Sequence, residues 1–418
     1  MSQPITSEPL RLALVDGPSY TPLYARLDEL TRDTGTPVEI VTRLPLPELI
    51  PHLREQLAVG EPYHLISAES RYTASLAPQL FPLDELLWAE EVERFSALSR
   101  DLCTWDGRLL QAPRSVETRL LFYRSDIFDD RREQRWFAEA SEGRSLRVPQ
   151  TWEELAAVAQ YFTRAGKMHG FAFPGTGPDL VAFFAEMVTT VGGTFFDWQE
   201  RPRFFSRAGV WCLTLLRDLY SRWEAVPAET PDCTQEDVSE LFRMGNCAMA
   251  LDRPNTARLL CDPTFSAVAA WHGVALAPAS KDGRRAVWTG CPTFAVPRSC
   301  PDPAAAAELL RFLTGPESQH LEAQHGAIPT RTDVYSEVET CLRSGTISHL
   351  RFTLAAQTLR MAALAPPKLP EYTEIEALLA PLLRAALTGD REPADALEEG
   401  QACVEALLGG RTEEGMGG

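Results

Sequence analysis

The chain has 418 residues, which is too long for one ordinary hydrophobic core and predicts two domains. Its hydrophobic fraction of 44% is typical of a soluble globular protein. The formal net charge of −18 argues against nucleic acid or an anionic membrane as a partner, and a neutral ligand or a protein partner fits better.

Nine cysteines are present, an odd number without any C-x-x-C pair. This pattern indicates neither a complete disulfide framework nor a structural zinc site, so we expect no metal or other cofactor. Buried free thiols are typical of a reducing compartment. The amino-terminal sequence MSQPITSEPLRLALVDG has neither the cationic nor the apolar region of a signal peptide, which favours the cytosol unless a leader has been removed.

The first region alternates strands and helices. LRLALV (residues 10–15), GTPVEIV (35–41) and YHLISAES (63–70) predict strands, and residues 23–31 predict the helix between the first two. A crossover of this length predicts a parallel pair.

Ligands of open parallel sheets bind beyond the carboxyl ends of the strands. The polar residues that follow the first and third strands are Asp16, Ser19, Tyr20, Ser67, Glu69 and Arg71. We therefore expect them on one rim of a cleft. The alternative is that Asp16 and Ser19 are ordinary turn residues.

A second pair of strands surrounds an unusually polar segment. One strand ends at Pro113 and the next runs from Val116 to Tyr123. The polar residues between or within them are Arg114, Ser115, Glu117 and Arg119. Residues 127–147 are charged and broken, and predict an exposed insertion. Thr151 with Glu154 then matches the capping box of a helix.

Two loops of the region 113–285 follow predicted strands. GFAFP (170–174) leads into a Gly/Pro loop, and no GK[ST] follows it, so we discount a phosphate loop. The strand from Cys247 to Leu251 precedes a second, polar loop. That loop contains Asp252, Arg253, Pro254 and Asn255. Asp252 or Asn255 can equally cap a helix.

These segments carry a family resemblance. PRSVETRLLFYRSDIF (113–128) followed by PQTWEELAAVA (149–159) resembles the crossover segment of extracellular solute-binding proteins of the carbohydrate type, the receptors that deliver sugars to ABC importers. DVSELFRMGNCAMALDRPNTARLL (237–260) and the stretch 301–335, with its IPTR, resemble later parts of the same family. The resemblance covers nearly the whole chain in the correct order.

The resemblance implies an α/β, two-lobe periplasmic-binding-protein-like fold of type II. Each lobe would be a mostly parallel sheet flanked by helices, with a ligand cleft between the lobes that closes about a hinge. Residues 1–112 would form the first lobe and 113–285 the second. Residues 286–345 would return to the first lobe, and the helices of 346–418 would pack on the second.

The resemblance also implies a sugar site, which needs hydroxyl-binding side chains beside aromatic platforms. The candidates for hydroxyl binding are Asp16, Ser19, Glu69, Arg71, Arg114, Glu117, Asp252, Arg253, Asn255 and Arg331. The aromatic candidates are Tyr20, Trp288 and Tyr372, with Trp271 a weaker one. The implied partners are the small-molecule ligand and the permease subunits of an ABC importer, outside the cytoplasm.

Other functions stay open at this stage. One is a cytosolic solute sensor without a leader. Another is a receptor for a polyol or a glycerophosphodiester, for which Arg114, Arg119 and Arg253 would bind phosphate. A third is a glycoside hydrolase using Glu69 and Glu117 as paired carboxylates. The sequence contains no G-x-S-x-G, H-E-x-x-H or Walker motif, so we predict a binding protein rather than an enzyme.

Overall fold

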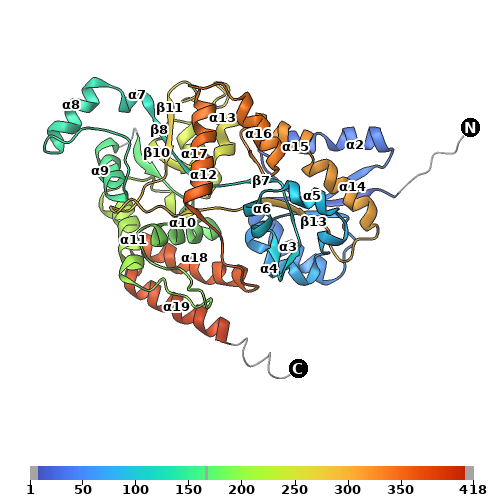
Figure 1. Ribbon diagram of the computed structural model, residues 1–418. Coiled ribbons are helices and arrows are strands. Elements are labelled where there is room, and N and C mark those ends of the chain that lie inside the picture. Colours follow the sequence, from blue (N-terminus) through green and yellow to red (C-terminus); the bar gives the residue numbers. More distant parts are fainter. Residues whose placement is uncertain (1–7, 165–167, 410–418) are drawn as a thin grey trace, which may run out of the picture. The chain divides into compact units, whose positions relative to one another are not determined.

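The computed structural model describes residues 8–164 and 168–409, which fold into two compact units (Figure 1). Unit 1 takes in the chain up to Glu117 together with Gly290–Leu342 and Lys368–Tyr372. Unit 2 takes in Thr118–Thr289, Arg343–Pro367 and the chain from Thr373 onward. Residues 1–7, part of the amino-terminal stretch that argued against a signal peptide, lie outside the described residues.

The limits of the units differ from the lobe limits expected from the sequence. The chain enters unit 2 after Glu117, not after Ala112, and it returns to unit 1 at Gly290. The short segment Lys368–Tyr372 belongs to unit 1, although the sequence assigned all of 346–418 to the second lobe.

Unit 1 is built on a five-stranded sheet in the order β2-β1-β3-β13-β6. Its strands are β2 (Val38–Leu44), β1 (Leu10–Val15), β3 (Leu65–Glu69), β13 (Pro292–Ala295) and β6 (Ala112–Pro113). The expected parallel pairing of β1 with β2 is confirmed, and β1 is also parallel to β3. β13 is antiparallel to both β3 and β6. The carboxyl ends of β1, β2 and β3 therefore lie at one edge.

Helices cover this sheet, and β1 and β3 are accordingly buried on both faces. α3 (Leu46–Ala58) packs on β1, and α14 (Pro303–Thr314) packs on β3 and β6. The other helices of unit 1 are α1 (Thr21–Tyr24), α2 (Leu27–Thr34), α4 (Thr73–Leu76), α5 (Ala89–Arg94), α6 (Ala97–Leu102), α15 (Pro316–Gln324) and α16 (Thr332–Cys341). Its 3₁₀ turns are η1 (Ser70–Tyr72), η2 (Ala77–Gln79) and η3 (Leu83–Glu85). Its two-residue strands are β4 (Thr104–Trp105), β5 (Arg108–Leu109), β7 (Ser115–Val116) and β14 (Ile328–Pro329).

Unit 2 is built on a four-stranded sheet in the order β11-β8-β10-β9. Its strands are β11 (His272–Leu276), β8 (Leu120–Arg124), β10 (Cys247–Asp252) and β9 (His169–Ala172). β8 is antiparallel to β10 and β11, whereas β9 and β10 are parallel. All six residues of β10 are buried, so this strand forms the centre of the core.

Helices surround this second sheet as well. α9 (Trp152–Phe162) packs on β9 and β10, α12 (Gln235–Arg243) on β10, and α17 (Ile347–Met361) on β11 and β8. The remaining helices are α7 (Ser125–Phe128), α8 (Arg131–Ala140), α10 (Gly177–Thr190), α11 (Arg207–Arg217), α13 (Ala257–Leu260), α18 (Tyr372–Thr388) and α19 (Pro393–Gly409). The short elements are η4 (Asp218–Arg222), η5 (Thr230–Asp232), η6 (Pro254–Thr256), β12 (Val287–Trp288) and β15 (Ala363–Leu364). Among the described residues, no helix is long and apolar enough to cross a membrane.

Two local predictions were wrong in part. Residues 127–147 are mostly exposed, as predicted, but they are not broken throughout, because they contain α8, which is anchored by the buried residues Glu133 and Phe137. The Glu133 carboxylate accepts hydrogen bonds from Tyr161 (2.7 Å) and Arg164 (2.5 Å), and this pairing makes a charged sequence pack as a helix. The strand expected from Val116 to Tyr123 is interrupted, because the chain passes from unit 1 to unit 2 within it.

Candidate functional site

In unit 1, a cluster of polar and aromatic groups is centred on Arg114. The Arg114 guanidinium is buried and lies over the ring of Tyr20, 4.1 Å from its centroid. It donates one hydrogen bond to the carbonyl oxygen of Ser19 (3.1 Å) and another from Nε to Oε1 of Glu322 (2.5 Å). Arg114 therefore holds the loop that follows β1 in a fixed place.

The charges of this cluster are set by burial and pairing. Burial raises the pKa of Glu322, while the Arg114 charge opposes that shift. Burial works to lower the pKa of Arg114, but Glu322 and the two tyrosines outweigh it and the pKa is raised. Burial also raises the pKa of Tyr24 to about 12, and its hydroxyl is 3.2 Å from Ser67 Oγ. Arg114 thus stays cationic, and Tyr24 stays a neutral hydrogen-bonding group.

Asp16 begins the same loop, directly after β1, and is exposed. Its Oδ1 pairs with Nε of Arg43 at 2.7 Å, and the Arg43 guanidinium lies 5.6 Å from the ring centroid of Tyr24. Tyr24 in turn stacks on Tyr20 with centroids 5.8 Å apart. The structure therefore joins Asp16, Tyr20 and Arg114 in one chain of contacts, through Arg43 and Tyr24.

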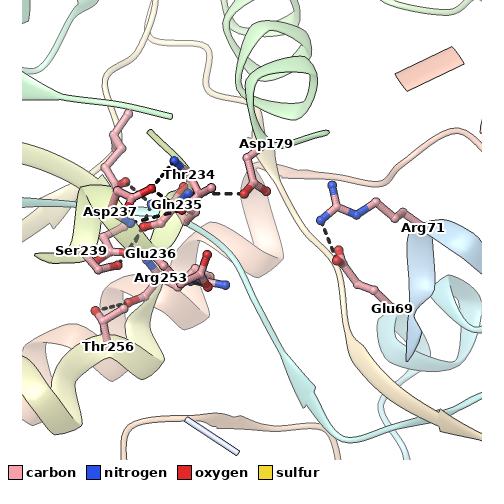
Figure 2. A network of polar contacts seen from close by, with 12 residues as sticks. Glu69, Arg71, Asp179, Thr234, Gln235, Glu236, Asp237, Ser239, Arg253 and Thr256 are labelled. Carbon is pink, nitrogen blue, oxygen red and sulfur yellow. Dashed lines mark hydrogen bonds and ion pairs between the residues drawn. The ribbon is translucent and has the colours of Figure 1, made fainter. Parts of the chain in front are cut away.

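A second group in unit 1 surrounds Gly290. Glu69 ends β3, and its Oε2 accepts a hydrogen bond from Arg71 Nη2 at 2.6 Å (Figure 2). Glu117 and Gly290 exchange both backbone hydrogen bonds, at 2.8 and 3.1 Å. A Cβ atom on Gly290 would lie 3.1 Å from Glu69 Oε1. Glu69 and Glu117 thus lie on either side of one glycine, which keeps the space beside Glu69 open.

Two further candidates of unit 1 are Arg331, which forms an ion pair, and Tyr372, which is buried. Arg331 pairs with both carboxylate oxygens of Asp333, at 3.1 and 2.7 Å, just before α16. Tyr372 is fully buried and is the first residue of α18, not a residue of the preceding loop. Their roles in ligand binding stay predictions.

In unit 2, the candidate residues gather at the carboxyl end of β10 (Figure 2). Asp252 is buried, and its Oδ1 accepts hydrogen bonds from the Arg253 backbone N–H (2.7 Å) and from the Gln235 side-chain amide (3.2 Å). Gln235 is held at the start of α12, where Thr234 and Asp237 form a capping box. The last residue of the strand is therefore tied to the first residue of the helix.

The loop after β10 is fixed by further polar contacts (Figure 2). Arg253 Nη2 donates to Oε1 of Glu236 (2.6 Å), and the Thr256 hydroxyl donates to the Arg253 carbonyl (2.7 Å). Arg351 of α17 donates to the carbonyl of Pro254 (3.0 Å). Asn255 lies within η6 between these anchors. The loop is thus held to both α12 and α17.

The Gly/Pro loop before α10 closely approaches another part of unit 2. A Cβ atom on Gly175 would lie only 1.9 Å from the carbonyl oxygen of Thr230, so the loop requires glycine here. Asp179, in the first turn of α10, accepts a weak hydrogen bond from the Gln235 backbone N–H (3.4 Å). The amino-terminal ends of α10 and α12 are therefore linked directly.

Burial raises the pKa of Asp252 to about 6, although the Arg253 charge acts in the opposite direction. Because the folded-state pKa exceeds the unfolded value, the folded state binds the extra proton. Its stabilising effect is present at low pH and is lost as the pH rises through about 6.

We therefore expect Asp252→Asn to flatten the pH dependence of unit 2 stability between about pH 4 and pH 7, by up to about 3 kcal/mol. The asparagine oxygen can still accept the hydrogen bonds of Gln235 and Arg253. Urea unfolding of both proteins over this pH range measures the effect. Parallel curves for the variant and the parent would contradict it.

Arg119 and Trp288 meet at a buried carboxylate elsewhere in unit 2. Arg119 Nη1 donates to Oε2 of Glu186 (2.9 Å), and the Trp288 backbone N–H donates to the same oxygen (3.1 Å). Burial raises the pKa of Glu186, and Arg119 opposes that shift. Trp288 itself is only 7% exposed in β12, whereas Trp271 is 56% exposed. Arg119, which had been considered for phosphate binding, is thus part of an interior ion pair.

Over residues 8–164 and 168–409, no group of three or more His, Cys, Asp or Glu side chains is arranged to hold a metal ion.

Comparison with known proteins identifies the family. The model of the bacterial extracellular solute-binding proteins matches residues 25–340. The chain belongs to this family. Among solved structures, the maltose-bound MalE3 of T. maritima superimposes with a TM-score of 0.83 at 23% identity, covering 95% of this chain and 99% of that one. The fold is therefore that of type II periplasmic-binding proteins, and the predicted α/β class and family are confirmed. The prediction that each sheet is mostly parallel was wrong, because β13 is antiparallel to β3 and β6, and β8 is antiparallel to β10 and β11.

Two curated relatives of this solute-binding protein have informative names. The "probable ABC transporter-binding protein" of Deinococcus radiodurans is 25% identical over 338 residues, covering 78% of this chain and 76% of the relative. The "mannitol-binding protein" of Pseudomonas aeruginosa is 25% identical over 322 residues, covering 72% of this chain and 70% of the relative.

Proposed function

We propose that this protein binds a neutral sugar or sugar alcohol and delivers it to an ABC importer. The observation that carries the proposal is the family match over residues 25–340. Support for the ligand class comes from the maltose held by the T. maritima structure and from the name of the mannitol-binding relative. Support for the importer comes from the name of the Deinococcus relative.

The chemistry around Gly290 suits a polyhydroxylated ligand. Ionised carboxylates accept hydrogen bonds from hydroxyl groups, and such charge-assisted bonds are stronger than neutral ones. Glu69 supplies a carboxylate beside Gly290, where the missing side chain leaves room, and Glu117 adjoins Gly290 through its backbone. Tyr20, positioned by Arg114, supplies an aromatic ring of the kind that packs on apolar sugar faces.

The pairing of the arginines favours a neutral ligand over a phosphorylated one. Three arginines are candidates for binding a phosphate group, and each forms an ion pair with a carboxylate. The pairs are Arg114 with Glu322, Arg119 with Glu186, and Arg253 with Glu236. A phosphate would have to compete with these carboxylates for the guanidinium groups, and it would add its charge to a chain of net charge −18.

A thermal-shift screen of protein unfolded and refolded free of carried-over ligand tests the proposal. The ligands are mono-, di- and oligosaccharides, polyols and sugar phosphates. A ligand at a hundredfold excess over its dissociation constant stabilises the folded state by about 2.7 kcal/mol. We expect a shift with a neutral sugar or polyol, and recovery of that ligand intact after prolonged incubation. A shift with sugar phosphates alone would overturn the ligand class, and cleavage of a glycoside would indicate a hydrolase.

Once a ligand is known, Glu117→Ala should weaken its binding more than tenfold, because one charge-assisted hydrogen bond contributes about 1.5–3 kcal/mol. The melting temperature of the unliganded variant should stay within a few degrees of the parent, since Glu117 is paired with Gly290 through its backbone. Isothermal titration measures the affinity. Glu93→Ala, an exposed carboxylate of unit 1, is the matched control. Unchanged affinity in the Glu117 variant would remove that residue from the site.

A further inference from the structure

Two cysteines of unit 1, far apart in the sequence, meet in its core. Cys103 directly follows α6, and Cys291 directly precedes β13. Both side chains are fully buried, and the pKa of the Cys103 thiol is raised by burial and by the neighbouring Cys291 thiol. Both are free thiols in the structure.

The backbone around this pair is fixed by hydrogen bonds through Ser70 and Thr73. Ser70 and Cys291 are joined twice: the Ser70 N–H donates to the Cys291 carbonyl (2.9 Å), and the Cys291 N–H donates to Ser70 Oγ (3.0 Å). The Thr73 hydroxyl lies 2.7 Å from the Ser70 carbonyl oxygen and 3.4 Å from that of Leu102, the neighbour of Cys103. The segments carrying the two cysteines are therefore held against the same short turn.

Gln111 ties the other sides of the two segments together. Its Oε1 accepts hydrogen bonds from Thr73 (2.9 Å) and from Thr293 of β13 (3.2 Å). The preceding residue, Leu110, donates its N–H to the carbonyl oxygen of Cys103 (3.1 Å). The contact between the two thiols thus follows from a polar network of the core and not from a flexible surface.

We propose that Cys103 and Cys291 form a disulfide bond when the chain folds in an oxidising environment. The oxidant is a small-molecule or protein disulfide, for which oxidised glutathione serves as the probe. The thiolate of one cysteine attacks the glutathione disulfide, giving a mixed disulfide and one glutathione thiolate. The second cysteine then attacks the protein sulfur of that mixed disulfide and releases the other glutathione. Two protein thiols are oxidised, and one glutathione disulfide is reduced to two glutathione thiols.

The disulfide would form during folding, before the two thiols are buried. In the folded protein neither sulfur is accessible, and burial raises the pKa of the Cys103 thiol, so the reactive thiolate is suppressed. Folding that starts in a reducing medium therefore leaves both thiols free and inert. Membership of an extracellular family makes the oxidising case relevant, because disulfides form and persist outside the reducing cytosol.

The bond would act beside the proposed ligand residues. Cys291 follows Gly290, whose backbone pairs with Glu117, and the next residue, Pro292, lies opposite Glu69 in the sheet. A covalent link from Cys291 to the end of α6 would hold this strand start in place and would resist its local opening.

The test uses the full chain, unfolded with reductant and then refolded with either reduced or oxidised glutathione. Remaining thiols are alkylated in denaturant, and the protein is mapped by mass spectrometry. We expect the oxidatively refolded protein to contain a peptide pair joining Cys103 to Cys291, two hydrogens lighter than the separate thiols. Its unfolding midpoint should lie about 5 °C or more above that of the reduced protein, because the bond closes a long loop.

Cys291→Ser should abolish both the linked peptide and the redox-dependent shift of the midpoint. Cys212→Ser is the matched control, since Cys212 is equally buried but its pKa is raised by burial alone. That variant should keep the Cys103–Cys291 link. Separate alkylation of Cys103 and Cys291 after oxidative refolding, or a glutathione adduct on each, would overturn the proposal. The peptide map of the unmutated chain decides this even where a variant fails to fold.

Discussion

Replacing Arg114 by methionine is expected to destabilise unit 1 by about 3–5 kcal/mol, because it leaves the carboxylate of Glu322 buried without its cation. Arg114 also holds the loop after β1 through Ser19 and Tyr20, and those contacts are lost as well. Urea unfolding followed by hydrogen exchange of unit 1 peptides separates this loss from any change in unit 2.

The double variant Arg114→Met with Glu322→Gln should recover much of that loss, since no buried charge remains. The deficit of the single variant should also depend on pH. Burial already raises the pKa of Glu322, and removal of Arg114 raises it further. A raised folded-state pKa stabilises at low pH and ceases to do so as the pH rises, so the deficit should be smaller at pH 5 than at pH 8. An equal deficit in both variants at both pH values would show that the ion pair is not the cause.

Glu186→Gln is expected to destabilise unit 2 by a similar amount, about 3–5 kcal/mol, because Arg119 becomes a buried cation without a counter-charge. Glutamine keeps the size of the side chain, and its oxygen can still accept the hydrogen bond of the Trp288 N–H. The substitution therefore isolates the loss of charge. Hydrogen exchange of peptides from β8, α10 and β12 reports the destabilisation where these three residues lie.

Asp218→Asn provides the matched control in the same unit. Asp218 pairs with Arg222 at 3.4 Å, and the Arg222 side chain is 70% exposed. Surface pairs of this kind contribute little, so we expect no measurable change. If Glu186→Gln were as harmless as this control, the interior pair would not stabilise unit 2.

The strands were predictable because their signals are local. LRLALV is apolar apart from Arg11 and forms β1, which is buried at every position except Arg11. The Thr151 hydroxyl caps α9 as predicted, accepting the N–H of Glu154 at 3.2 Å. No local sequence signal identified Glu322 and Glu186 as the carboxylates that pair with Arg114 and Arg119. They lie 208 and 67 residues from the arginines that they neutralise, and only the tertiary fold brings them together.

In the candidate site, too, features with local sequence signals were predictable, and contacts made only by the tertiary fold were not. Polar residues after β1, β3 and β10 could be named from the rule that parallel strands end at one edge. Glu69 and Glu117 both lie next to Gly290. Their proximity depends on the register of β13 against β3 and on the bridge between residues 117 and 290, and no local sequence pattern encodes either one. The helix within 127–147 was also missed, because burial of Glu133 requires Tyr161 of α9 and Arg164, which follows that helix.

The order of strands in unit 1 has a consequence for synthesis of the chain. β13 lies between β3 and β6, yet it is made of residues 292–295, which are translated only after residues 118–289 of unit 2. Until then, one side of β3 has no hydrogen-bonding partner, and the first 117 residues cannot complete their sheet. An unpaired strand edge of this kind is a template for association with other chains. The sheet of unit 1 therefore stays incomplete, with this edge unpaired, until the chain has been made as far as residue 295 of 418.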